Sequence, residues 1–237
     1  MELNHPLNTR VKSPINKKAG HGDISIPLAV GMMFFLLIGS MCLALFLNRN
    51  FLGVLSFYLV TTTLYSFYLK RIAVLDVLIL AALYTVRIFA GSMACDIIVS
   101  SWLFMFSIFF FTSLAFVKRY TELLTADGNV SNQSLVGRGY YSGDIQLVSQ
   151  FGVASAFTSV LVLVFYLFSK DVQELYRNPH YLSAFVPIIG YWIMRVWLLA
   201  HRGNMKDDPI EFALKDKTSL LLGVITIIIF ATAVISF

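Results

Sequence analysis

Residues 101–124 read SWLFMFSIFFFTSLAFVKRYTELL, and this stretch decides the fold class. Positions 101–117 hold apolar side chains and small hydroxyl residues without a charge, and the run ends at Lys118 and Arg119. A helix of about 20 apolar residues crosses the hydrocarbon core of a bilayer. Strands of a membrane barrel would instead alternate apolar and polar residues. The stretch therefore predicts a transmembrane helix that ends at a basic interface.

The composition of the whole chain agrees with this prediction. Of its 237 residues, 58% are hydrophobic and 13% are charged, whereas an ordinary soluble domain has about 25% charged residues. Mean hydropathy is +0.76. The 21 phenylalanines exclude a disordered chain, and two cysteines exclude a disulfide scaffold. Lipid is the expected solvent.

Seven stretches are long and apolar enough to span a membrane. We predict an all-α integral membrane protein, a seven-helix transmembrane bundle over residues 26–237 that follows an N-terminal tail at 1–25. The expected spans are 26–47, 51–69, 72–95, 101–117, 148–168, 181–200 and 219–236.

The basic residues predict the orientation. Thirteen of the 18 Lys and Arg residues lie in the tail, the link at 70–71 and the loops at 118–147 and 201–218. Lys and Arg mark the cytoplasmic face. We therefore expect a plasma (bacterial inner) membrane protein with a cytosolic N-terminus and an outside C-terminus. The net charge of +5 reflects this topology and gives no support for nucleic-acid binding.

Three ionisable residues fall within the expected spans. Asp76 and Arg87 are eleven positions apart, so they share a helix face about 16 Å apart and cannot pair. Each is a site candidate because buried charge in a membrane is costly. The alternatives are an interfacial cap for Asp76 and a structural ion pair or carbonyl contact for Arg87. Arg195 is expected to extend its side chain to the interface.

The two expected cytosolic loops hold further polar candidates. Lys118 and Glu122 have the i,i+4 spacing of a helical ion pair. Gly137–Asp144 offers Arg138 and two phenols, a weak signal for phosphate binding. Asp207 or Asp208 precedes Pro209 as an N-cap would. A solvated loop surface remains the alternative to a phosphate site. The scattered histidines predict no zinc site.

Several of these segments resemble the UbiA prenyltransferase superfamily. Tyr65-Ser66-x-x-Leu69-Lys70-Arg71 with Asp76-Val77, followed by Tyr84-x-x-Arg87 and Gly91, resembles the middle of that fold. More specific are Lys118-Arg119-Tyr120-x-Glu122-Leu123 and Asp208-Pro209-x-Glu211-x-Ala213-Leu214-x-Asp216. These two resemble the decaprenyl-phosphate phosphoribosyltransferase branch, which makes polyprenyl-phosphate phosphoribose.

The resemblance implies transfer of a 5-phosphoribosyl group from phosphoribosyl pyrophosphate to a polyprenyl phosphate, with Mg²⁺ as cofactor. It also implies roles for residues at the cytosolic face. Lys70, Lys118 and Arg119 would contact phosphate oxygens, and Asp76 and Glu122 would bind metal or ribose hydroxyls. Further substrate contacts are expected from Tyr65, Arg87, Tyr120, Arg138, Tyr141, Asp208 and Glu211.

The chain departs from the family pattern at its start. Family members carry an Asp-rich motif before a His-Pro segment, whereas here only Glu2 precedes His5-Pro6. The seven spans would thus be helices three to nine of the UbiA fold, with the first two helices and the main Mg²⁺-binding aspartates lacking. Two alternatives follow: a prenyltransferase with another acceptor, or a truncated, non-catalytic lipid-binding paralogue.

Overall fold

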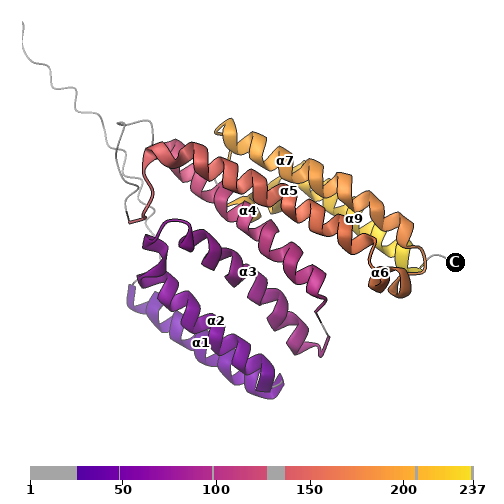
Figure 1. Ribbon diagram of the computed structural model, residues 1–237. Helices are drawn as coiled ribbons and strands as arrows, with labels where there is room; N and C mark the ends of the chain where they lie inside the picture. Colours follow the sequence, from indigo (N-terminus) through magenta and orange to yellow (C-terminus); the bar gives the residue numbers. More distant parts are fainter. Residues whose placement is uncertain (1–25, 48, 98, 127–136, 206–207, 236–237) are drawn as a thin grey trace, which may run out of the picture. The chain divides into compact units, whose positions relative to one another are not determined.

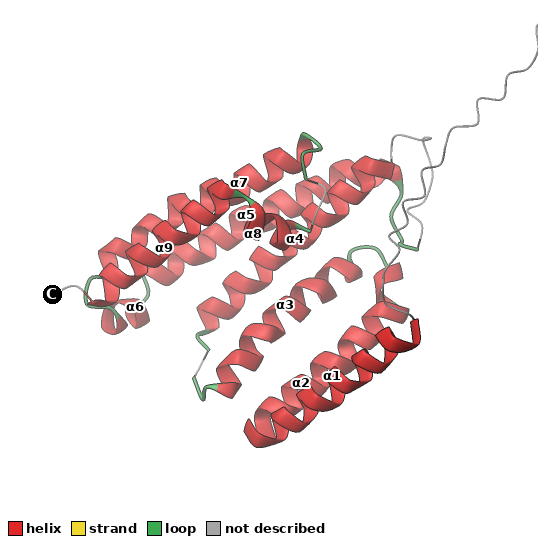
Figure 2. Cartoon of the chain, turned by 180° about the vertical axis from the view of Figure 1, so that it is seen from behind, coloured by secondary structure: helices red, strands yellow, loops and turns green. Residues whose placement is uncertain are grey.

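The computed structural model describes residues 26–47, 49–97, 99–126, 137–205 and 208–235. Within these ranges the regular structure is helical and no strand occurs (Figure 2). Seven of the described helices are long and apolar enough to cross a membrane. The predicted all-α membrane bundle is therefore confirmed, and the chain is an integral membrane protein.

The chain forms two compact units, residues 1–43 and 44–237. In the first unit the described residues belong to α1 (Ile26–Leu47), which continues to the beginning of the second. The second unit contains the helices α2 (Arg49–Phe67), η1 (Leu69–Arg71), α3 (Leu75–Ala94), α4 (Ser101–Ala126), η2 (Ser142–Asp144), α5 (Ile145–Leu167), α6 (Lys170–Leu175), η3 (Pro179–Ala184), α7 (Phe185–His201), α8 (Pro209–Lys215) and α9 (Lys217–Ile235).

The predicted loops contain helical structure. α4 continues to Ala126 and so carries the Lys118–Glu122 segment on its last turns. The second predicted loop contains α8, whose N-cap is Asp208: its Oδ1 accepts the Ile210 N–H at 3.1 Å. Pro209 follows at the first helical position, where its missing N–H costs nothing. Asp207, the other predicted cap, lies outside the described residues.

Helices α4, α5 and α7 pack side by side (Figure 1), and Gly152 of α5 lies where they contact one another. A Cβ atom added there would lie 2.1 Å from Cζ2 of Trp197 and 2.7 Å from Cβ of Phe116. The Trp197 indole N–H donates to Ser113 Oγ at 3.0 Å, which satisfies this polar group inside the core. A small residue thus lets three helices approach closely, as is common in membrane proteins.

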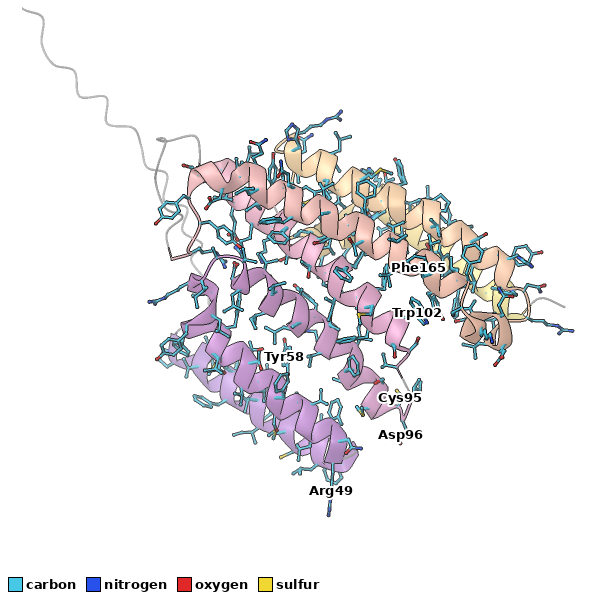
Figure 3. All side chains as sticks on the ribbon, viewed as in Figure 1. Arg49, Tyr58, Cys95, Asp96, Trp102 and Phe165 are labelled. Carbon is cyan, nitrogen blue, oxygen red and sulfur yellow. The ribbon has the colours of Figure 1, made fainter. Side chains whose placement is uncertain are left out.

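Many large apolar side chains point away from the rest of the chain. Phe165 of α5, labelled in Figure 3, is 53% exposed, and Phe168 is 79% exposed. In water such a surface would aggregate, whereas in a bilayer it faces lipid tails at no hydrophobic cost. The charged side chains described next gather at one end of the second unit.

Candidate functional site

Four charged side chains form a cluster where α3 begins and α4 approaches its end. Asp76 is fully buried, and its Oδ2 lies 2.7 Å from Nε of Arg119 and 3.6 Å from Nη1 of Arg138. Arg119 Nη1 also contacts Glu122 Oε2, and Arg138 Nε lies 3.2 Å from the same oxygen. Two carboxylates and two guanidinium groups thus alternate, so their formal charges cancel. We call Asp76, Arg119, Glu122 and Arg138 the charged cluster.

The segment before η2 is held on the start of α3 by Tyr140. Its hydroxyl donates to Asp76 Oδ1 at 2.7 Å and accepts the Val74 N–H at 2.7 Å. Val74 has φ +66°, a conformation that costs a β-branched residue energy. Burial and the hydrogen bond to Asp76 raise the pKa of Tyr140, so this phenol remains a donor at neutral pH.

Gly139 allows this segment to lie directly on the backbone before α3. A Cβ atom at Gly139 would lie 2.7 Å from the Arg71 carbonyl oxygen and 2.9 Å from the Ala73 nitrogen. Only glycine fits this approach without displacing the chain. We call residues 137–140 the strap. Its two neighbouring side chains, Arg138 and Tyr140, both reach Asp76.

The hydrogen bonding of the charged cluster is incomplete. Arg119 Nε and Asp76 Oδ2 are close enough for an ion pair but are not aligned for a hydrogen bond. Arg119 Nη2 is also buried without a hydrogen-bond partner in the described part of the chain. Native proteins usually satisfy such atoms with protein, water or ligand. Donor capacity thus remains inside the cluster.

Lys118 and Asp208 form a second, more accessible ion pair beside the charged cluster. Lys118 Nζ lies 2.7 Å from Asp208 Oδ2, and both side chains are partly exposed. The same Asp208 caps α8, so one carboxylate fixes a helix end and positions a lysine. Tyr84 of α3 lies against this pair, where it lines a small crevice with Lys118 and Asp208.

This arrangement corrects the predicted pairing of Lys118 with Glu122. Spacing alone favours that i,i+4 pair. In the structure α8 instead brings Asp208 to Lys118, and Glu122 forms ion pairs with two arginines. An isolated helical pair contributes only about 0.2–0.5 kcal/mol. Contacts between helices therefore override it easily.

The structure gives Arg195 a partner that the sequence did not predict. Arg195 binds Asp216 through two hydrogen bonds of 2.7 and 3.0 Å. The Ser219 N–H and hydroxyl donate to the same carboxylate at 2.8 Å each. Asp216 stands between α8 and α9, within the loop at 201–218 that is predicted to be cytosolic, so its carboxylate lies at the end of the span toward which Arg195 is expected to extend. Chiefly because of the Arg195 hydrogen bond, the pKa of Asp216 is lowered.

Several predicted site residues lie apart from the charged cluster. Tyr120 is buried and shares a 2.9 Å hydrogen bond with His201 Nδ1. Glu211 pairs with Lys215 along α8. Tyr141 is 59% exposed, and its backbone N–H donates to Asp144 Oδ2 while its carbonyl accepts the Asp144 N–H.

Three further candidates lie at different distances from the cluster. Tyr65 lies at its edge, since its hydroxyl is 3.5 Å from Arg138 Nη1. Lys70 stands in η1 next to the strap and forms no ion pair with any described residue. Arg87 contacts Tyr58 of α2, further along α3.

The role of Tyr140 was not predicted from the sequence. Of the two phenols in the Gly137–Asp144 run, Tyr141 was the predicted contact, and adjacent residues in a loop show no periodicity that distinguishes them. The close approach required of Gly139, directly before Tyr140, is the signal that singles it out, and it is visible only in three dimensions.

The predicted metal ligands do not form a ready metal site. Asp76 and Glu122 are both engaged by arginines, and no group of three His, Cys, Asp or Glu residues suited to a metal occurs in the described ranges. Mg²⁺ prefers an octahedral set of oxygen ligands without cations in contact. The described residues therefore do not fit a resident Mg²⁺ ion. Glu2 lies outside them.

Two adjoining apolar cavities extend away from the charged end. One of about 300 Å³ is lined by residues of α4, α7, α8 and α9, including Trp192, Ala213 and Ser219. The other, of about 580 Å³, shares Phe106 and Ile189 with it and continues to Trp102 at the opposite end of α4. Their walls are almost entirely hydrocarbon and aromatic, which suits an apolar chain.

Comparison with known proteins shows resemblance to longer bacterial proteins. The chain is 44% identical over 181 residues to "Uncharacterized protein y4nM" of Sinorhizobium fredii, covering 76% of this chain and 35% of that protein. It is 32% identical over 186 residues to nodulation protein NoeC of Azorhizobium caulinodans, covering 78% and 59%. The decaprenyl-phosphate phosphoribosyltransferase of Mycolicibacterium smegmatis is 26% identical over 201 residues, covering 82% and 62%.

The matches therefore span 35% to 62% of the length of these relatives. No protein-family model matches the chain. The chain thus has distant relatives that carry a phosphoribosyltransferase name, and this agrees with the expected resemblance at a coarse level.

Proposed function

We propose that this chain is a membrane transferase of the UbiA type that moves a 5-phosphoribosyl group from phosphoribosyl pyrophosphate to a polyprenyl phosphate. The observation that carries the proposal is the charged cluster, in which the buried guanidinium group of Arg119 is incompletely hydrogen-bonded. The apolar cavities and the named phosphoribosyltransferase relatives support the same substrate pair. The distribution of Lys and Arg supports a cytosolic position for the cluster.

In this reaction an oxygen of the lipid phosphate forms a bond to C1 of the ribose. The bond between C1 and the pyrophosphate oxygen breaks, and pyrophosphate leaves with that electron pair. Negative charge grows on the leaving group, so the protein must supply cations where it departs. Arg138 and Lys118 suit this task because both are partly exposed and bound to carboxylates that a phosphate could replace.

Arg119 is better suited to hold the other cluster residues in place than to contact the substrate directly. Its side chain is 1% exposed and forms ion pairs with both Asp76 and Glu122. Burial fixes its geometry, and this in turn positions Arg138 through the shared carboxylates. Lys70 and Tyr65, at the edge of the cluster, are proposed as further phosphate contacts. The described carboxylates do not fit resident Mg²⁺, so Mg²⁺ is proposed to arrive bound to the pyrophosphate of the donor.

The test supplies the purified chain in nanodiscs with labelled phosphoribosyl pyrophosphate, polyprenyl phosphate and Mg²⁺. A labelled lipid with release of pyrophosphate supports the proposal, and Arg138→Gln should reduce its rate by about a hundredfold. Arg202→Gln removes an exposed cation at the same end and should leave the rate unchanged. Product from a prenyl diphosphate and an aromatic acceptor would favour a prenyltransferase instead. No product with either pair would contradict catalysis by this chain.

A further inference from the structure

Arg87 is a membrane-embedded cation without a carboxylate partner among the described residues. It lies about 18 Å along α3 from Leu75 and about 10 Å before Ala94, well inside the span. Its Nε and Nη2 donate to the Tyr58 hydroxyl at 3.1 and 2.6 Å. A charge at such depth is costly, and arginines within spans usually pair with an anion or mark a ligand path.

Two tyrosine rings hold this guanidinium group. Its Cζ lies 4.8 Å from the centre of the Tyr84 ring and 5.4 Å from that of Tyr58. Cation–π contacts orient the group but leave its formal charge in place. Arg87 also remains exposed after these contacts. The planar guanidinium group is therefore fixed, charged and accessible, which is the state that binds a phosphate well.

A second observation comes from Thr62 of α2, one helical turn from Tyr58 on the same face. The Thr62 Oγ1 atom is buried and has no hydrogen-bond partner among the residues that the structure describes. Its neighbour Thr63 instead donates to the Leu59 carbonyl, the usual solution for a hydroxyl in a helix. A ligand oxygen between α2 and α3 would satisfy Thr62. Tyr65, one further turn along, contacts Arg138 of the charged cluster.

We propose that Arg87, with Tyr58 and Tyr84, forms a binding site inside the membrane for the phosphate group of a lipid. Tyr58, Thr62 and Tyr65 form a polar stripe on α2 from this site to the charged cluster, about 16 Å away along α3. The site goes beyond the proposed transfer, because it binds a lipid phosphate whether or not the chain transfers a group to it. The preferred ligand is a prenyl phosphate monoester.

The first experiment uses the unaltered chain in zwitterionic nanodiscs without any phosphoribosyl donor. Phenylglyoxal modifies accessible arginines, and mass spectrometry reports each position. Prenyl phosphate should protect Arg87 but not Arg49, which stands at the far end of α2 (Figure 3). The corresponding prenol should protect neither. Equal modification of Arg87 with and without prenyl phosphate would overturn the proposal.

The second experiment compares affinities for prenyl phosphate. Arg87→Gln should weaken the Kd about tenfold or more, since a hydrogen bond to a charged group is lost, while Arg49→Gln should not change it. Unchanged affinity in a folded Arg87→Gln protein would contradict the site. Inorganic phosphate and phosphatidylglycerol are then tested as competitors of prenyl phosphate. A competitor that displaces it only when Arg87 is present would support the anion site and identify the source of phosphate that competes.

These measurements separate the site from the proposed transfer. Arg87-dependent binding without a labelled product would sink the proposed function and keep the site. A labelled product without protection of Arg87 would support the proposed function and contradict the site.

Discussion

At the scale of single residues, Tyr140 connects the strap, the strained Val74 and the buried Asp76. Tyr140→Phe removes the donor to Asp76 and the acceptor for the Val74 N–H. Buried groups without partners should lower the free energy of unfolding by about 1–3 kcal/mol. Thermal unfolding in detergent measures this loss. Tyr141→Phe is the matched control because that ring is 59% exposed, and equal stability losses for both variants would contradict the assigned role.

Asp216 predicts a dependence of stability on pH. Its pKa is lowered in the folded protein, chiefly by the Arg195 hydrogen bond, so the ionised form stabilises the fold above the unfolded pKa of about 4. That stability is lost as pH falls through the lower, folded pKa. Wild-type thermal stability should therefore exceed that of Asp216→Asn at pH 7, and the difference should shrink below about pH 4. A constant difference from pH 7 to 3 would argue against this ion pair.

The members of the charged cluster were predicted from the sequence, but their partners were not. Asp76 was a candidate as an ionisable residue within a span and Arg138 as the cation of a glycine-rich loop, whereas Arg119 and Glu122 were candidates through the family resemblance. Lys118 was assigned to Glu122, whereas α8 brings Asp208 to it across 90 positions. Spacing along one helix could not reveal that contact.

At the scale of elements, Gly152 determines how closely α4, α5 and α7 approach. Gly152→Ala places a methyl group within 2.7 Å of Phe116 Cβ and closer still to the Trp197 ring. Overpacking should cost about 1–3 kcal/mol of stability. Gly190→Ala in α7 is the control, since its added Cβ meets no atom within 4 Å. Denaturation of both variants in detergent checks the difference, and equal stability would refute tight packing at Gly152.

The strap gives a second prediction at this scale. Gly139→Ala would displace the segment from Arg71 and Ala73, and with it Arg138 and Tyr140. A shift of about 1 Å can cost a hundredfold in rate, so the transfer rate should fall by ten- to a hundredfold. Gly143→Ala has open space around its added Cβ and serves as control. Full activity of Gly139→Ala would show that the strap does not position the site.

At the scale of the whole molecule, the asymmetry of basic residues predicts the orientation. In a Cys42→Ser, Cys95→Ser background, Leu175→Cys should react with a membrane-impermeant maleimide in intact cells, because Leu175 is 71% exposed at the predicted outer end. Arg202→Cys should react only after permeabilisation. The opposite labelling pattern would reverse the proposed topology and place the charged cluster outside.

The seven spans, the concentration of charge at one end and the ionisable residues within the spans could all be predicted from the order of residues alone. These properties depend on the free energy of transferring each segment from water to lipid. This free energy depends on local sequence and is largely additive along the chain. Three contacts could be found only in the folded chain: Tyr140 rather than Tyr141 reaches Asp76, Arg195 binds Asp216, and Arg87 contacts the rings of two tyrosines. These contacts depend on the distances between helices. Side-chain packing sets those distances to within about an ångström, and the spacing of residues along the chain does not encode them.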